Sequence, residues 1–411
     1  MIDAITPPRP SHVQNRALQV ASSFTSRPLA AKLRPFLAGA GVADGLQFVE
    51  YGQIAEYMLG PASDAEHIIG TLVLVRVEDW LRNELKNGHS DSDLSQKARQ
   101  TLTAHVDEFV KQITALALRG KPVWLLLCPS NGWIAESHML APLCRTYTNL
   151  VLARVRSTPG VTVLNWPNSL TGPEVSDRNT DRLGQIPFTP AAFQQLSQFI
   201  GPEIETHLAS RTANAGTASS KGKSDLAKFL AGLEVRVRLF APQRGDRAHV
   251  DRILRTAAAF SLTGEKRDLS DAEVDRIVES GGCLLVTVSD RLSTYGPSGV
   301  ISSRIDQDSL VVEELALSCP VLGKQVEYAV IVGLAQIGSE RAYSRLVFEY
   351  TPSGRNQIML KFLESIGDPV RETRFSLPAA EANERIRKTA VAPGTWTLES
   401  EGNLLCAKNS S

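Results

Sequence analysis

Short apolar runs alternate with longer segments of mixed polarity from about residue 20 to residue 208. The apolar runs cover 46–51, 71–77, 122–128, 149–155 and 161–164, and helical spacing of apolar residues falls within 99–118 and 190–208. Several runs are almost continuously apolar, which is typical of parallel strands that helices cover on both faces. The pattern predicts an α/β fold, with a doubly wound parallel-sheet domain over residues 1–208.

Residues 209–224 are rich in Ala, Ser, Thr and Gly and contain almost nothing to bury. This composition is typical of a flexible linker, so we expect a domain boundary there. Beyond it, Val235, Val237 and Leu239 alternate with charged residues, which is the period of a strand with one buried face. The sequence therefore predicts a second domain over residues 225–411.

The second domain mixes the two hydrophobic periods. We expect strands over 234–240, 283–290, 309–317 and 344–350, helices over 247–260, 326–337 and 355–367, and a turn over 293–299. Strands and helices in this order predict a mixed α/β domain.

The chain has 411 residues, and its 44 Lys and Arg residues balance 44 Asp and Glu residues. This balance argues against the broad positive surface of a nucleic-acid-binding protein. The apolar runs are shorter than a bilayer requires and the first ten residues lack the apolar core of a signal peptide, so we expect no membrane association and a cytoplasmic location. The five cysteines lack the paired spacing of a disulfide framework or a zinc site, so we expect thiols and no bound metal.

Cys319 lies where an apolar strand pattern ends and a helical pattern begins, in the stretch SCPVLGKQV. We expect a tight turn through Val321 and Gly323, where the N–H groups of the helix start and the Lys324 charge favour an anion. The anion would be the phosphate of a pantetheine-type carrier arm or of coenzyme A. The same field lowers a thiol pKa of about 8.5 by up to ~0.7 unit. The alternative is that Cys319 is a packing residue, because cysteine is among the most buried residue types.

Segments 287–301, 315–331 and 348–367 resemble the C-terminal, GNAT-like domain of FkbH-like proteins. That family loads a three-carbon glyceryl unit onto an acyl carrier protein for polyketide assembly. Its pattern consists of Ser-Asp-Arg-Phe-Gly, Ser-Cys-Arg-Val-Leu-Gly with a glutamate four residues later, and Thr-x-Lys-Asn. The resemblance implies that Cys319 accepts an acyl group as a thioester and passes it to the carrier's phosphopantetheine thiol.

The resemblance also implies roles for three other residues by motif position. Asp290 or Glu327 would orient a base or a substrate hydroxyl, and Asn356 would bond a thioester carbonyl. The alternative for each is structural bonding of a turn or a helix start.

The sequence departs from the family pattern at several positions. Pro320 replaces an arginine, Leu292 replaces a phenylalanine and Arg355 replaces a lysine. Residues 255–264 are apolar where the family carries an Asn- and Gln-containing motif. Because lost amides are lost hydrogen-bond donors and acceptors, we expect an acyl group other than glyceryl.

The first domain resembles the SGNH-hydrolase-like N-terminal region of the same family, through segments 22–37, 48–63, 72–80 and 181–196. A working hydrolase of that kind needs a serine in a Gly-Asp-Ser context and an Asp-x-x-His to take its proton. Ser23 falls near the nucleophile position, but no histidine occurs between residues 139 and 206, and Gln185 stands where relatives tend to have one. Glutamine cannot act as a general base, so we expect a degenerate hydrolase fold kept for docking or substrate shaping.

FkbH-like proteins usually carry a haloacid-dehalogenase-like phosphatase domain between these two regions, marked by Asp-x-Asp-x-Thr. That motif does not occur in this sequence, and the linker 209–224 fills the position. We therefore expect a separate phosphatase, or an acyl donor that is already a thioester.

Together these patterns predict an acyltransferase of a polyketide or nonribosomal-peptide type of pathway. It would move a glyceryl-like or other small acyl unit through Cys319 to or from an acyl carrier protein, without a tightly bound cofactor. An SGNH-type ester or thioester hydrolase acting through Ser23 and a non-catalytic carrier-protein adaptor are the alternatives. Ordinary amine acetylation is less expected, because the turn at 320–326 has a single glycine.

Overall fold

The computed structural model describes residues 16–39, 42, 45–60, 67–82, 91–170, 172–211, 222–264, 269–341 and 343–400. These residues form two compact units. The first takes its residues from 1–50, 61–80 and 106–220, and the second from 51–60, 81–105 and 221–411. The second unit thus includes two segments from within the range expected for the first domain, because tertiary contacts and not chain order decide to which unit a segment belongs.

The sheet of the first unit has five strands in the order β2-β1-β3-β4-β5, and every neighbouring pair is parallel. The strands are β1 (Ala17–Ser22), β2 (Gly45–Phe48), β3 (Ile68–Arg76), β4 (Val123–Cys128) and β5 (Val161–Leu164). The prediction of an α/β fold with a doubly wound parallel sheet is confirmed by this order. β4 is buried at all of its positions, as its continuous apolar run predicted.

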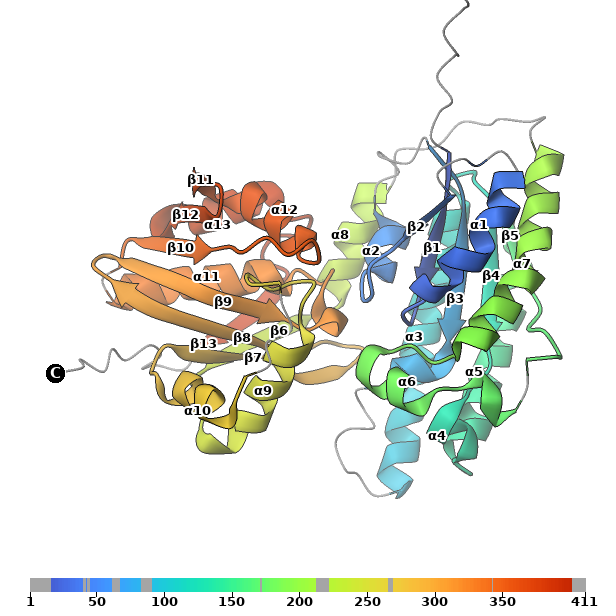
Figure 1. The fold of residues 1–411 in the computed structure, drawn as a ribbon, viewed down its shortest axis with the longest axis horizontal. Coiled ribbons are helices and arrows are strands. Elements are labelled where there is room, and N and C mark those ends of the chain that lie inside the picture. Colours follow the sequence, from blue (N-terminus) through green and yellow to red (C-terminus); the bar gives the residue numbers. More distant parts are fainter. Residues whose placement is uncertain are drawn as a thin grey trace, which may run out of the picture. The chain divides into compact units, whose positions relative to one another are not determined.

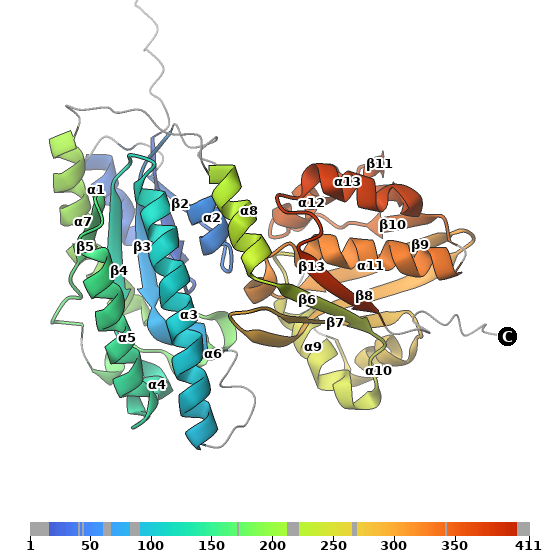
Figure 2. The same ribbon diagram turned by 180° about the vertical axis from the view of Figure 1, so that it is seen from behind.

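Helices cover both faces of this sheet. They are α1 (Ala30–Gly39), the C-terminal part of α3 (Asp91–Ala117), α4 (Gly132–Glu136), α5 (Leu140–Val155), α6 (Arg178–Gly184) and α7 (Pro190–Arg211). Figure 1 shows α1 and α7 in front of the strands, and Figure 2 shows α3 and α5 in front from the opposite side. The core between α1, α7 and the sheet includes Leu33, Phe193, Ile200, Leu72 and Trp124.

The sheet of the second unit has eight strands in the order β11-β12-β10-β9-β8-β7-β6-β13. The strands are β6 (Val235–Phe240), β7 (Cys283–Ser289), β8 (Thr294–Asp306), β9 (Ser309–Leu317), β10 (Arg345–Glu349), β11 (Asp368–Arg371), β12 (Arg374–Pro378) and β13 (Trp396–Ser400). Most pairs are antiparallel, but β9 pairs with β10 and β6 pairs with β13 in parallel. The second unit is therefore the predicted mixed α/β domain.

The helices of the second unit are α2 (Ile54–Leu59), α8 (Gly222–Gly232), α9 (Arg247–Thr256), α10 (Asp271–Glu279), α11 (Val326–Arg341), α12 (Gln357–Ile366) and α13 (Ala382–Thr389). Figure 2 shows α11 lying across the sheet, and it contacts β6, β10 and β13. α9 and α10 form a separate core with β7 and β8 through Val250, Leu254, Val274 and Leu285. Within the described residues, no helix is long and apolar enough to span a bilayer.

Two predicted elements are wrong. Residues 149–155 were expected as a strand but belong to α5, where burial falls on Leu140, Cys144, Val151 and Val155, at helical spacing. A short apolar run does not by itself distinguish a strand from a buried helix. The turn expected over 293–299 lies almost entirely in β8, where shifts of register opposite β7 accommodate its glycines and proline.

The boundaries of other elements also differ from the prediction. β1 is central in the first sheet, although its mixed sequence ALQVAS did not indicate a strand. α7 continues to Arg211 and α8 begins at Gly222, so both ends of the expected linker 209–224 are helical. The residues between these helices lie outside the described residues.

Candidate functional site

The residues around Cys319 form a compact loop between β9 and α11. Cys319 begins a single turn of 3-10 helix that ends at Val321, and α11 begins only at Val326. Gly323 and Gln325 both have positive φ, at 75° and 64°, which turns the chain sharply before the helix. The helix begins at Val326, as predicted, and Cys319 is separated from it by the 3-10 turn and the bend at Gly323.

Exposure separates Cys319 from the other described cysteines. Cys128, Cys144 and Cys283 are buried, whereas Cys319 is partly exposed. Burial raises the thiol pKa of Cys144 and of Cys283 to about 12, and it also raises that of Cys128. These three thiols are therefore protonated packing residues, and the sulfur of Cys319 remains as the candidate nucleophile. Cys406 lies outside the described residues.

Lys324 pairs with a carboxylate of the same unit. Its Nζ lies 2.7 Å from Asp290 Oδ2 and 4.9 Å from the centroid of the Tyr295 ring. Burial opposes the Lys324 charge, but Asp290 outweighs this effect and raises the pKa of the ammonium group. The loop after β7 and the loop after β9 are thus joined by an ion pair, and the Lys324 charge is already neutralised.

Asp290 has no capacity left for a substrate. Its Oδ1 accepts hydrogen bonds from the backbone N–H groups of Leu292 and Ser293, both at 2.8 Å. Its Oδ2 accepts from Tyr295 at 3.1 Å as well as from Lys324. Burial opposes the Asp290 charge, but Lys324 and these donors keep the carboxyl pKa low. Asp290 is therefore a structural anchor, not the orienting acid that the motif position implied.

The expected phosphate site at Val321, Gly323 and Lys324 is also contradicted by the charges around it. The Val321 side chain is buried, and its backbone N–H already donates to Ser318. A Cβ placed on Gly323 would lie 3.0 Å from Glu56 Oε2, so a carboxyl group occupies the space beside this glycine. With Lys324 paired to Asp290, the loop offers a negative group and no uncompensated positive one to a phosphate.

Glu327 lies in the first turn of α11 and is half-buried. Within the described part of the chain, its Oε2 is inaccessible to solvent and has no hydrogen-bond partner. Burial raises the pKa of Glu327 to about 8, and the nearby Glu56 carboxyl adds to the rise. Glu56 comes from α2, and burial raises its pKa too. The structure therefore brings two acidic side chains together next to the Cys319 loop.

Asn356 is fully buried, and protein groups satisfy its whole amide. Its Nδ2 donates to the carbonyl oxygens of Ser261 and Thr351, both at 3.0 Å. Its Oδ1 accepts from Tyr350 at 2.9 Å and from the Ser353 backbone at 3.1 Å. No donor or acceptor remains for a thioester carbonyl, so the substrate role expected for Asn356 is wrong and its role is structural.

Asn356 bonds the segment Phe260–Gly264, which meets β9 through the isolated bridge between Ser261 and Ala316. Leu317 of β9 donates its N–H to the Phe260 carbonyl at 2.9 Å, and Thr351 donates to the Leu262 carbonyl at 2.8 Å. The buried carboxylate of Glu314 accepts from the Leu262 N–H and from the hydroxyls of Ser261 and Thr263. The apolar segment that departs from the family pattern is thus fixed beside β9 by backbone bonds and by the Glu314 and Asn356 side chains.

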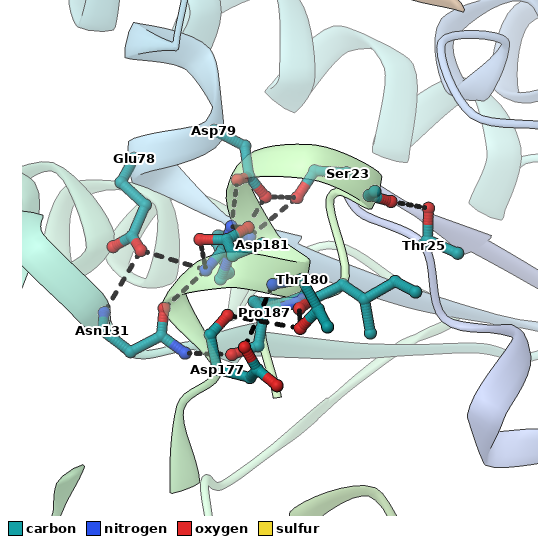
Figure 3. Close-up of polar contacts among 12 residues, drawn as sticks. Ser23, Thr25, Glu78, Asp79, Asn131, Asp177, Thr180, Asp181 and Pro187 are labelled. Atoms are coloured by element: carbon teal, nitrogen blue, oxygen red, sulfur yellow. Dashed lines mark hydrogen bonds and ion pairs between the residues drawn. The ribbon is translucent and has the colours of Figure 1, made fainter. Parts of the chain in front are cut away.

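In the first unit, Ser23 lies just after β1 within a buried charged cluster (Figure 3). Its Oγ donates to Asp79 Oδ2 at 2.6 Å and accepts from the Arg76 backbone N–H at 3.0 Å. Asp79 in turn accepts from Arg76 Nε at 3.2 Å and from Nη2 at 2.5 Å. A carboxylate already bound twice by a guanidinium is a poor acceptor for the serine proton.

The Arg76 guanidinium is surrounded by further groups at the carboxyl ends of the strands. Nη1 and Nη2 reach the two carboxylate oxygens of Asp181 at 3.3 and 3.0 Å, and Nη1 also donates to Asn131 at 2.5 Å. Glu78 Oε1 lies 3.2 Å from Nη1. Burial raises the pKa of Glu78 to about 7, against the opposing effect of Arg76. The Arg76 guanidinium is thus paired with Asp79, Asp181 and Glu78, and Glu78 keeps its proton to a higher pH than an exposed glutamate does.

Gln185 adopts a left-handed conformation at the end of α6, with φ of 56°. Its backbone carbonyl accepts from the N–H of Thr25 at 2.8 Å, two residues after Ser23. That Gln185 stands at the position of a missing base stays a prediction of the SGNH resemblance. The described residues around Ser23 supply carboxylates but no histidine.

Sequence reasoning did not find Glu56, Glu314 or Arg76. Glu56 lies in a short helix within the range expected for the first domain, and nothing in its sequence indicates that it faces Glu327. Arg76 ends the apolar run of β3 and is fully buried. An arginine directly after a continuously apolar run is the one sequence signal that could have indicated it, because such a run predicts burial on both faces of the strand.

His105 is a further residue that the sequence did not indicate. It lies in α3 beside the Lys324–Asp290 pair, and burial and the Lys324 charge lower its pKa to about 3. Its imidazole is therefore neutral at physiological pH. No group of three or more His, Cys, Asp or Glu side chains in the described part of the chain is arranged to hold a metal ion.

No protein-family model matches the chain, and no curated protein matches it. Among solved structures it is similar to a GNAT-family acetyltransferase from Staphylococcus aureus Mu50, at 8% identity over 35% of this chain and 99% of that chain, with a TM-score of 0.29. It is also similar to a spermidine N-acetyltransferase from Vibrio cholerae in complex with coenzyme A and spermine, at 11% identity over 36% and 97% of the two chains and a TM-score of 0.28.

A third similar structure is the N-terminal part of a Bacteroides fragilis protein that contains a phosphatase domain complexed with Mg. It matches at 15% identity over 45% of this chain and 50% of that chain, with a TM-score of 0.34. Similarities as weak as these three assign no activity to the chain.

Proposed function

We propose that this protein is an acyltransferase that holds its acyl group as a thioester on Cys319. The observation that carries the proposal is the partial exposure of Cys319 at the end of β9, while the three other described cysteines are buried. A thiol must meet both its acyl donor and its acyl acceptor, so exposure is the first requirement for this chemistry.

The order of the motifs around Cys319 supports membership of the FkbH-like family, and therefore an acyl carrier protein as the partner. The donor and acceptor would be the phosphopantetheine thiol of that carrier, or coenzyme A, in a polyketide or nonribosomal-peptide type of pathway in the cytoplasm. Because the Gly323 turn has no uncompensated positive charge, we propose that the thiol end of the arm, not its phosphate, approaches this loop.

Hydrolysis through Ser23 is supported less well. The carboxylate that accepts the Ser23 hydroxyl is bound to Arg76 by two hydrogen bonds, so it cannot readily take the serine proton. The first unit is then a domain for docking or substrate shaping, as the degenerate SGNH resemblance implies.

The test is the intact mass of the protein after mixing with acyl thioesters of N-acetylcysteamine and with acyl-loaded carrier protein. Wild type should gain one acyl mass that hydroxylamine removes. Cys319→Ala should gain none, and Cys283→Ala, at a buried cysteine, should gain the same mass as wild type. Absence of a hydroxylamine-labile mass in wild type, or its persistence in Cys319→Ala, overturns the proposal.

A further inference from the structure

The short segment around α2 lies against the Cys319 loop at two points within the second unit. A Cβ on Gly52 would lie 2.2 Å from the Cys319 carbonyl oxygen, so only a glycine allows this approach. One helical turn later, Glu56 Oε2 would lie 3.0 Å from a Cβ on Gly323, and Gln53 is also in contact there. Residues 52–56 therefore cover the loop from Cys319 to Gly323.

This placement puts the Glu56 carboxyl beside Gly323, four residues before Glu327 at the start of α11. The charge of Glu56 acts on Glu327, and both side chains are half-buried. Glu327 Oε2 has no hydrogen-bond partner and no access to water. Among the described residues no positive charge raises or lowers the pKa of either acid, unlike Glu78, which Arg76 stabilises.

Two neighbouring, half-buried carboxyl groups without a cation beside them cannot both ionise cheaply. The pair retains one proton near neutral pH and releases it as a coupled unit. A group that is half-protonated near the working pH is suited to take up a proton and return it. The next residue, Tyr328, has its pKa raised to about 12 by burial and by both acids, so it stays neutral.

We propose that Glu56 and Glu327 together form the proton-transfer group that serves Cys319. This inference rests on the acyl transfer proposed above. When the Cys319 thiol attacks a thioester, the bond from Sγ to the acyl carbon forms and the bond from that carbon to the leaving sulfur breaks. The thiol proton passes to the ionised member of the pair and from there to the leaving thiolate, so the pair is unchanged after the exchange. Transfer of the acyl group to a carrier thiol runs the same steps in reverse.

The first test does not depend on acyl transfer. Alkylation of Cys319 by iodoacetamide is followed by intact mass from pH 6 to 10, in wild type, Glu327→Gln, Glu56→Gln and Glu399→Gln. Glu399 is exposed on β13 and serves as the control. Wild type and the control should show two steps in the rate, because ionisation of the pair opposes formation of the thiolate. Glu327→Gln should show one step at lower pH, and a single step in wild type overturns the proposal.

The second test measures single-turnover acylation of Cys319 by the N-acetylcysteamine thioester. Glu327→Gln should slow it about 100-fold, as loss of a general base does. Glu56→Gln should move the pH inflection of the rate downwards by about one unit, because it removes the like charge beside Glu327. A residue with only a structural role would leave this inflection in place.

The two tests separate the two ideas. If the two-step alkylation profile is present but wild type accepts no acyl group, the acyltransferase proposal fails and the coupling of the pair to Cys319 stands. If wild type is acylated and Glu327→Gln matches Glu399→Gln in rate and pH profile, the proton-transfer pair fails and the acyltransferase proposal stands.

Discussion

Two clusters of buried acids, one in each unit, differ in whether a cation lies among them. In the first unit the acids around Arg76 share one guanidinium, whose N–H groups bond Asp79, Asp181 and Asn131. In the second unit Glu56 and Glu327 meet without any cation among the described residues, and Glu327 keeps an oxygen with no partner. Glu78 Oε2 is also buried without a hydrogen-bond partner among the described residues, so the two clusters differ in the presence of a cation and not in an unbonded oxygen. A guanidinium bonded to several acceptors favours a structural role for its cluster. Acids without a nearby cation can still exchange a proton, so the comparison favours the second unit for the acyl transfer proposed above.

The largest expected effect comes from removing the cation of the first unit. Arg76→Met should lower the free energy of unfolding by about 4 kcal/mol, because it leaves buried carboxylates without their partner. Urea unfolding followed by circular dichroism measures this loss. The control is Arg27→Met, whose exposed pair with Glu50 should contribute less than about 1 kcal/mol. Equal losses in the two variants would mean that the cluster is not held by Arg76.

The next effect concerns a saturated amide in the second unit. Asn356→Ala should destabilise the protein by about 3 kcal/mol, because the buried groups that it bonds would lose their partners. Urea unfolding checks this, with the exposed Asn179→Ala as the control. A variant that unfolds like wild type but no longer accepts an acyl group would instead make Asn356 a substrate ligand.

A smaller effect depends on pH. The pKa of Glu78 is raised to about 7, mainly by burial, so the folded state binds this proton more tightly than the unfolded state does. Its stabilising contribution is complete below the unfolded pKa and is lost as the pH rises through 7. Glu78→Gln mimics the protonated acid and does not titrate. The free energy of unfolding of this variant minus that of wild type should therefore increase by about 2 kcal/mol from pH 5 to pH 8. A difference between the two proteins that is constant with pH would show that Glu78 titrates normally.

The smallest effect concerns the serine of the first unit. Ser23→Ala removes one hydroxyl that bonds Asp79, and it should lower stability by about 1 kcal/mol. It should leave acylation of Cys319 unchanged, as intact mass would show. Labelling of Ser23 by a fluorophosphonate, together with turnover that survives Cys319→Ala, would favour the hydrolase and reverse the comparison between the units.

Some of the candidate site could be predicted from the chain alone. The position of Cys319 at the end of a strand follows from the apolar run before it, and that strand ends at Leu317. Its distance from α11 did not follow, because the intervening residues form a 3-10 turn and a sharp bend at Gly323. Motif position indicated Asp290 and Asn356. The residues that occupy all of their hydrogen-bonding atoms, such as Lys324 and Ser261, come from segments remote in the sequence.

Local pattern in the sequence determined the strands β4, β6, β7 and β9 and the helices α11 and α12, because hydrophobic period is a property of neighbouring residues. It also determined the alternation that makes the first sheet parallel and doubly wound. Only the tertiary structure decided that Glu56 packs beside Glu327 and that Arg76 joins Asp79 to Asp181. Such pairings join residues that are far apart in the sequence, and closing the loops between them costs conformational entropy. Burial of apolar surface between whole helices and strands offsets that cost, and the pattern of a short segment does not reveal which segments will pack together.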